Sequence, residues 1–221
     1  MSTIGAPTRS LSVGLTAWQR AGKRGFDVAV AMAVLVGLGW LIPPLALLAR
    51  WSTGGSGILR QTRVGRHGRP FTILKLRTMR ATHDGPTVTT EDDARLTRFG
   101  QWLRRLELDE LPQFANVLLG DMSLVGPRPD VPGFADLLTG PDRVVLSVRP
   151  GITGPATLVY RHEEYELGRH DEPERHNVEV IWPAKVQINR RYVERWCWRA
   201  DVRYLWLTLR RDTLSLDEAL P

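Results

Sequence analysis

The chain of 221 residues lacks the features that mark several common protein classes. Its single cysteine, Cys197, cannot form an intrachain disulfide, so the fold cannot depend on such cross-links. Its five histidines show no zinc-ligand spacing, and neither a P-loop nor a dinucleotide-binding fingerprint occurs. No internal repeat occurs either. The sequence therefore gives no support to a redox enzyme, a P-loop enzyme or a repeat protein.

Basic residues outnumber acidic ones. There are 30 Lys+Arg against 24 Asp+Glu, which gives a formal net charge of +6 and a pI near 10.1. Such a chain favours an anionic partner, either phosphates or an acidic membrane surface, and the charge alone does not decide between them. Nucleic acid is not among the partners that we expect. The length suits one compact domain with an appendage. The oligomeric state stays open, with a homodimer as one option.

An uncharged, apolar run extends from Val28 to Ala49. As a straight helix it would reach roughly 33 Å, the thickness of a hydrocarbon core. Pro43 and Pro44 interrupt it, because each ring removes a backbone donor and restricts the residue before it, which favours a break near Ile42. Basic residues flank both ends, so the positive-inside tendency draws both ends towards the cytoplasm.

These signals favour a re-entrant membrane helix over residues 16–51, preceded by a disordered tail at 1–15 and followed by a cytoplasmic domain with interfacial helices at 52–221. A single membrane-spanning anchor remains open, as does a helix buried inside a soluble protein. A signal peptide is disfavoured by the length of the run, by Asp27 at its start and by the lack of a small-x-small cleavage site.

The rest of the chain predicts an α+β fold that is predominantly helical. Two extended runs, 59–63 and 70–76, flank a glycine-bearing turn at 65–68 and predict a small β-hairpin. The segments 126–129 and 149–154 are rich in glycine and proline, which excludes a helix or a central strand and predicts shaped loops.

Helices are predicted at 95–106, at 111–119 with a stop at Gly120, and at 184–211. The last one is amphipathic and lies either on anionic lipid or on the core of its own domain. Its arginines recur every fourth residue beside the apolar stripe, at Arg191, Arg195, Arg199 and Arg203.

Eight lysines or arginines and no acidic residue lie from Arg50 to Arg80, directly after the apolar run. Attraction to an anionic leaflet explains most of them. Lys75 and Arg77 differ, because alternation along the strand from Pro70 aims both side chains to one face, where they can converge on phosphate groups.

Asp109 and Glu110 form a carboxylate pair directly before Leu111 and Pro112. Asp109 can be the N-cap of the following helix, and the same position suits phosphate chemistry because helix N-termini attract anions. The two roles are compatible. Adjacent carboxylates can also divide labour, with one attacking phosphorus and the other holding a divalent cation.

Positive charge for such a site is available nearby. It comes from Arg98, Arg104 and Arg105 on the preceding predicted helix and from Arg128. Pro127 and Pro129 fix the backbone on both sides of Arg128, which is more than a solvated surface arginine requires. We therefore favour a functional role for Arg128.

A series of short motifs runs from Lys23 to about Arg211. They are KRGFD at 23–27, RVG at 63–65, KLRTM at 75–79, LDELPQ at 108–113, NV at 116–117, GDMSLVGPRP at 120–129 and RPGITG at 149–154. Through their order and spacing the chain resembles the bacterial sugar transferase family, the small monotopic phosphoglycosyl transferases. Each motif alone is weak, whereas the series is specific and covers nearly the whole chain.

The resemblance implies a catalytic domain on the cytoplasmic face of the bacterial inner membrane, held there by a re-entrant helix. It also implies magnesium-dependent transfer of a sugar phosphate from a UDP-sugar to polyprenyl (undecaprenyl) phosphate, the first membrane step of polysaccharide synthesis. Asp109 then matches the nucleophile, which forms a covalent phosphosugar intermediate as UMP leaves, and Glu110 together with Asp109 matches the magnesium site. The residues matched to phosphate binding are Lys75, Arg77, Arg104, Arg128, Pro129 and Arg149.

The chain departs from the family pattern at two places, of which the second concerns sugar recognition and the first leaves the role of Asp130 open. Asp130 stands where the family commonly has glutamate, and Pro155-Ala156-Thr157 stand where an aromatic residue and glutamine are common. The sequence therefore does not name the sugar. Trp182 and Tyr160 are candidates for the sugar pocket, although core packing is the favoured role for both.

Two other functional classes remain open. A membrane-anchored scaffold with a degenerate site explains the charge and the apolar run but not the carboxylate pair in a basic surrounding. A polyprenyl-diphosphate phosphatase would use an aspartyl-phosphate with water in place of the sugar donor.

Overall fold

The computed structural model describes residues 15–80 and 93–219. The disordered tail predicted at 1–15 lies outside these ranges except for Leu15, which is buried. The helices are α1 (Ala17–Leu38), α2 (Ile42–Thr53), α3 (Arg98–Arg105), α4 (Gln113–Leu119), α5 (Pro155–Val159), α6 (Glu163–Leu167), α7 (Pro173–His176), α8 (Trp182–Glu194), α9 (Trp198–Arg210) and α10 (Leu216–Ala219). The strands are β1 (Ile58–Val64), β2 (Pro70–Leu76), β3 (Ser123–Val125) and β4 (Gly151–Thr153).

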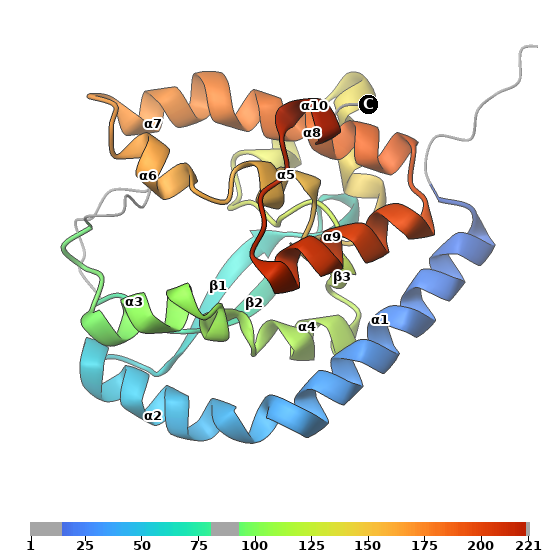
Figure 1. Cartoon of the computed structure of the whole chain (residues 1–221). Coiled ribbons are helices and arrows are strands. Elements are labelled where there is room, and N and C mark those ends of the chain that lie inside the picture. The colour runs from blue at the N-terminus through green and yellow to red at the C-terminus, as the bar shows by residue number, and fades with distance from the viewer. Residues whose placement is uncertain (1–14, 81–92, 220–221) are drawn as a thin grey trace, which may run out of the picture.

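The helices and strands lie in successive layers, with the long N-terminal helices at one side of the molecule and helices from the C-terminal half of the chain at the other. Figure 1 shows α1 and α2 along one side of the molecule, α3 and α4 next to them, the β1–β2 hairpin in the middle, and α6, α7 and α8 on the far side. The predicted α+β class, predominantly helical with small sheets, is confirmed.

The apolar segment forms two helices joined by a bend. A 3-10 turn over Gly39–Leu41 lies between α1 and α2, so the predicted break near Ile42 is confirmed. Figure 1 shows the bend between the two helices. Pro43 and Pro44 lie in the first turn of α2, where their missing N–H groups have no helical partner to lose.

Helical structure over Ala17–Thr53 is long and apolar enough to cross a membrane, with a mean hydropathy of 2.2 in its most apolar window. Only 11% of that window is buried, which argues against a helix enclosed by a soluble core. Large apolar side chains are exposed along it, at Trp18, Met32, Val36, Leu38, Trp40, Leu47, Leu48 and Trp51.

Polar contacts fix the first half of α1 to the domain. Asp27 accepts hydrogen bonds from Ser123 Oγ (2.8 Å) and from the N–H of Leu124 (3.1 Å) in β3. Lys23 Nζ lies 2.5 Å from Asp201 Oδ2 in α9. The KRGFD motif therefore joins the apolar helix to β3, which lies within the motif at 120–129, and to α9.

The predicted hairpin is confirmed. β1 and β2 pair antiparallel, with Leu59 opposite Lys75 and Val64 opposite Pro70. The segment 149–154 was expected to be a loop, and this is wrong for Gly151–Thr153, which form β4 and pair parallel with β3. The glycines permit this approach, because a Cβ on Gly154 would lie 2.3 Å from the carbonyl oxygen of Gly126.

The single helix predicted at 184–211 is wrong, because α8 ends at Glu194 and α9 begins at Trp198. Trp196 turns into the core between them and donates a hydrogen bond from Nε1 to Asp201 (3.0 Å), while Cys197 is extended. α8 docks on the domain, whereas α9 leaves Val202, Trp206 and Leu209 exposed. Of the segment predicted as one amphipathic helix, α9 is therefore the part with exposed apolar side chains.

Candidate active site

A tight turn between α3 and α4 carries the carboxylate pair. The chain reverses at Glu107, which has a left-handed φ of 58°, and then forms a 3-10 turn over Leu108–Glu110. The predicted capping role of Asp109 is wrong, because α4 begins after Pro112 and no side chain caps its N-terminus. The extra residues of the 3-10 turn separate Asp109 from the helix, which frees its carboxylate from backbone hydrogen bonding.

Glu110 is held by two cations. Its Oε1 accepts from Lys75 Nζ at 2.9 Å and from Arg128 Nη2 at 2.5 Å. Burial alone would raise the pKa of Glu110, but Arg128 and Lys75 hold it well below the ordinary value. Reciprocally, Glu110 raises the pKa of Arg128. Glu110 is therefore an ionised and immobilised carboxylate.

Asp109 has the opposite character. It is only 8% exposed, yet among the described residues its carboxylate takes no hydrogen bond and no ion pair. Burial, together with the charge of Glu110, raises the pKa of Asp109 above its ordinary value. A carboxylate that is poorly solvated and has no bound donor is more basic and more nucleophilic than a paired one, so this geometry suits attack by Asp109 on an electrophile.

The pair lies in the wall of a cavity of about 840 Å³. Nine lysines and arginines and six acidic residues line this cavity, which gives it an excess of positive charge that suits an anionic ligand. The positive residues are Arg63, Lys75, Arg77, Arg80, Arg95, Arg104, Arg128, Arg161 and Lys185.

Five of the residues predicted for phosphate binding line this cavity. Lys75 and Arg128 contact Glu110, and Pro129 lies beside Arg128 in the wall. Arg104 bonds Glu164 at 2.8 Å and Thr78 Oγ1 at 3.2 Å. Arg77 follows the end of β2 and donates to the carbonyl of Ser56 (2.7 Å), so it does not converge with Lys75 on the carboxylates.

Arg149 lies elsewhere. Its Nε donates to the carbonyl oxygen of Gly120 at 2.7 Å, next to the N-terminal part of α1, and it does not line the cavity of Asp109. Arg98 and Arg105, which were considered as further charges on α3, do not line the cavity either. Of the arginines predicted on α3, the structure therefore brings only Arg104 to the site.

The far wall of the cavity contains residues that sequence reasoning did not select. Glu164 of α6 pairs with Arg104, and Glu163 of α6 pairs with Lys185 of α8. Lys185 Nζ also lies 5.6 Å from the ring centre of Tyr160. No sequence motif predicts that these charged residues belong to the site, because their positions depend on contacts between segments that are distant in the sequence.

One positioning residue could have been found from the NV motif. Asn116 on α4 accepts from the N–H of Leu74 (3.0 Å) and donates to the carbonyl of Thr72 (2.8 Å). It therefore fixes α4, and with it the preceding turn, against β2, which carries Lys75. An amide is suited to this role because it both donates and accepts.

The residues that depart from the family pattern also face the cavity. Ala156 and Thr157 of α5 line it, as do Asp130, Tyr160 and Trp182. Tyr160 and Trp182, for which core packing was favoured, do pack against buried core clusters and also line the cavity. Some of the positions at which the chain departs from the family pattern therefore lie in the wall of the cavity.

The donor set at the pair fits a hard divalent cation. Asp109 offers a carboxylate with no protein donor bound to it among the described residues, and both cations on Glu110 contact the same oxygen, Oε1. Carboxylate oxygens are the ligands that Mg²⁺ uses, usually one or two of them with substrate phosphates and water completing the shell. The two side chains are suited to that role.

Comparison with known proteins identifies the group to which this fold and site belong. The model of the bacterial sugar transferase family matches residues 18–213. The chain belongs to this family. The match includes the apolar helices, the carboxylate turn and the Gly-Pro loops, so the family's shared region covers every part of the candidate site.

Individual family members resemble the chain over different shares of their length. The uncharacterized sugar transferase EpsL of Bacillus subtilis is 35% identical over 87% of this chain and 88% of its own length. The UDP-glucose:undecaprenyl-phosphate glucose-1-phosphate transferase of Escherichia coli is 34% identical over 88% of this chain but only 41% of its own length. The UDP-N-acetylgalactosamine-undecaprenyl-phosphate N-acetylgalactosaminephosphotransferase of Aeromonas hydrophila is 39% identical over 62% of this chain and 34% of its own length. The chain thus spans less than half the length of the last two of these three relatives, whose names specify a reaction.

Proposed function

We propose that this sugar transferase moves a sugar-1-phosphate from a UDP-sugar to undecaprenyl phosphate, as the membrane step that starts polysaccharide synthesis. The observation that carries the proposal is the asymmetry of the carboxylate pair. Asp109 is buried and unpaired among the described residues, whereas Glu110 is held by Lys75 and Arg128. The names of the relatives support the donor and acceptor classes.

In the first half-reaction an oxygen of Asp109 attacks the phosphorus that carries the sugar. The P–O bond to the other phosphate breaks, UMP leaves with the electron pair, and Asp109 becomes a mixed anhydride bearing the phosphosugar. In the second half-reaction a phosphate oxygen of the polyprenyl carrier attacks the same phosphorus, and Asp109 leaves as a carboxylate. No proton is consumed overall, so the site requires charge stabilisation more than acid–base groups.

Lys75, Arg104 and Arg128, which all line the cavity, supply that stabilisation. Lys75 and Arg128 are prepositioned by Glu110, and Arg104 is prepositioned by Glu164. Arriving phosphates compete with these carboxylates for the cations, because phosphate oxygens accept charge-assisted hydrogen bonds as well as carboxylates do. Asp109 and Glu110 would hold a magnesium ion, which when bound neutralises charge on the diphosphate.

We further propose that α1 and α2 form a re-entrant hairpin, with both ends and the catalytic domain on the cytoplasmic face of the inner membrane. The bend at Gly39–Leu41 and the exposed apolar side chains of both helices support this arrangement. Basic residues near both ends favour the same side for each. Labelling of cysteines placed at residues 19 and 52 in intact spheroplasts distinguishes it from a single span, in which the two positions would react from opposite faces.

The activity is tested by UMP release from a panel of UDP-sugars, using purified full-length protein with undecaprenyl phosphate and magnesium. UMP release with one donor and none with an Asp109→Asn variant supports the transferase and identifies its sugar. We expect the part of the cavity wall around Ala156 to determine which UDP-sugar is preferred, because the sequence departs from the family pattern there. Release of inorganic phosphate from a polyprenyl diphosphate, without any use of UDP-sugar, would instead establish a phosphatase.

A further inference from the structure

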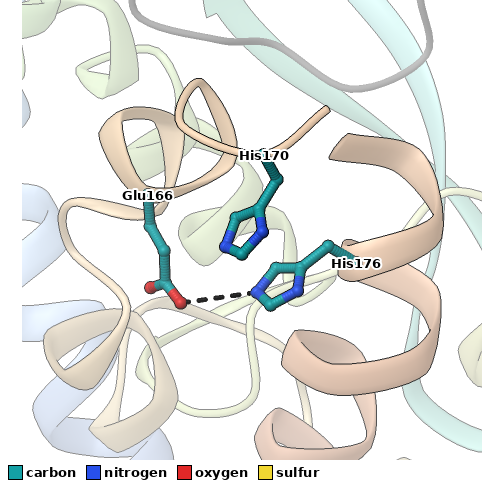
Figure 2. Close-up of side chains that lie close together, drawn as sticks. All are labelled: Glu166, His170 and His176. Atoms are coloured by element: carbon teal, nitrogen blue, oxygen red, sulfur yellow. Dashed lines mark ion pairs between the residues drawn. The ribbon is translucent and has the colours of Figure 1, made fainter. Parts of the chain in front are cut away.

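A cluster of side chains that can bind a metal lies in residues 163–176, which comprise α6, α7 and the turn between them and which we call the cap of the cavity. The cluster is separate from the carboxylate pair. Figure 2 shows Glu166, His170 and His176 pointing towards one another. Glu166 belongs to α6, His176 is the last residue of α7, and His170 lies in the turn between these helices. The nearest ligand atoms of the three side chains all lie within 4.8 Å of one another.

The two imidazoles are brought together by the fold. Their rings stack at 3.7 Å between centroids with an interplanar angle of 16°. His176 Nε2 is buried and, within the part of the chain that the structure describes, makes no hydrogen bond. Glu166 Oε1 lies 3.5 Å from it, which is too far for a good hydrogen bond. A buried ring nitrogen in this state requires a further partner, and a metal ion is one such partner.

The distances are compatible with metal coordination. Metal–ligand bonds of about 2.0–2.2 Å in a tetrahedron place the ligand atoms roughly 3.3–3.6 Å apart. The His176–Glu166 distance of 3.5 Å already meets that spacing. All three ligand atoms lie within 4.8 Å of one another, so any wider pair must close by about an ångström at most. The lone pairs of the two imidazoles lie in their ring planes, so the stacked rings must also turn out of their parallel arrangement to face one ion. Side-chain rotation allows both movements because Glu166 and His170 are exposed.

We propose that Glu166, His170 and His176 form a binding site for a divalent transition metal of the zinc class. Two imidazole nitrogens and one carboxylate oxygen are ligands that zinc commonly takes, with a water in the fourth position. Mg²⁺ and Ca²⁺ prefer oxygen ligands only, so this site differs in chemistry from the pair at Asp109. The absence of zinc-ligand spacing inferred from the sequence is wrong for His170 and His176, because the five residues between them fall within the range found between zinc-binding histidines. The turn between α6 and α7 brings the two rings together.

Metal binding here would hold the cap of the cavity. The helix α6 also carries Glu163 and Glu164, whose pairs with Lys185 and Arg104 form the cavity wall. A metal that links α6 to the end of α7 restricts the motion of this segment relative to the wall. The expected consequence is slower exchange of backbone amides over residues 163–176 when zinc is present. This outcome does not depend on the sugar donor or on catalysis.

The test is zinc titration of full-length protein that has been purified in detergent and freed of metal with a chelator. A competing chromophoric chelator reports the stoichiometry, and hydrogen–deuterium exchange reports the cap. We expect one zinc per chain at micromolar affinity or tighter, lost in His170→Gln and in His176→Gln. His162→Gln is the matched control, since it removes an exposed imidazole next to α6 but outside the cluster, and it should retain binding.

Two results would overturn the proposal. One is the absence of zinc binding by the wild-type protein, which would leave His176 and Glu166 as a simple ion pair. The other is binding that persists unchanged when both His170 and His176 are replaced, which would place the zinc elsewhere, for example at Asp109 and Glu110. Because His170 is exposed, its replacement is not expected to disturb folding, and a circular dichroism spectrum like that of the wild type verifies this.

Discussion

Replacing Lys23 by methionine tests how the membrane helix is held to the catalytic domain. Lys23 Nζ lies 2.5 Å from Asp201 Oδ2, and the two side chains are only 10% and 2% exposed. Loss of one partner of a buried ion pair costs about 3–5 kcal/mol, because the other charge is left without compensation. Asp201 keeps hydrogen bonds from the hydroxyl of Tyr192 (2.8 Å) and from Trp196 Nε1 (3.0 Å). We therefore expect a loss near the lower end, about 3 kcal/mol in the free energy of unfolding.

Unfolding of the full-length protein in mild detergent, followed by tryptophan fluorescence, measures this loss. In a thermal melt it corresponds to a fall in Tm of roughly 6–12 °C for a chain of this size. Arg199→Met removes an exposed cation from the same helix as Asp201, so it is the matched control and should change stability by no more than about 0.5 kcal/mol. In the double variant with Asp201→Asn the loss should be smaller than the sum of the single losses. A loss for Lys23→Met as small as that of the control would refute the inference that this pair holds α1 to α9.

Three further predictions concern the site. Asp109→Asn should raise the Tm at neutral pH, because a carboxyl group whose pKa is raised by folding destabilises the fold at any pH where it is ionised. This gain in Tm should vanish as the pH falls through the raised pKa. An unchanged or lower Tm at pH 7 would contradict the argument that burial raises the pKa of Asp109. For the same reason the wild-type activity should fall on the acid side at a pH above the ordinary aspartate value, and a rate profile that is flat into that range would speak against Asp109 as nucleophile. Arg128→Lys should lower kcat/KM by about 10²–10³ and leave the Tm nearly normal, because Glu110 keeps its ion pair with Lys75. Arg149→Met should instead lower the Tm and leave kcat/KM within a few-fold of wild type. The reverse pattern would exchange the roles of the two arginines.

Local sequence rules predicted the parts of the site that depend on short-range order. The alternation that starts at Pro70 put Lys75 on the correct face of β2, and the two prolines around Arg128 indicated a fixed arginine. The break in the apolar segment also followed from local chemistry, because two prolines in succession cannot continue a helix from its interior.

Contacts between distant segments were not predictable from those rules. The break between α8 and α9 depends on Trp196, whose indole finds a buried partner in Asp201 rather than a place on a continuous helix stripe. The charges of Glu163 and Glu164 reach the cavity through ion pairs that link α6 to α8 and to α3, which are distant in the sequence. Arg149 was grouped with the phosphate residues by its motif, whereas its position depends on the parallel pairing of β3 with β4.

The central claim is that Asp109 forms a covalent bond to the phosphosugar, and trapping that species tests it most directly. Full-length protein is incubated with the UDP-sugar that supports UMP release, with magnesium and without undecaprenyl phosphate, then digested and examined by mass spectrometry. The account predicts one equivalent of UMP per chain and a sugar-phosphate adduct on Asp109, both absent in Asp109→Asn. Release of UMP only when undecaprenyl phosphate is present, with no adduct on any carboxylate, would contradict it and indicate direct transfer between the two substrates.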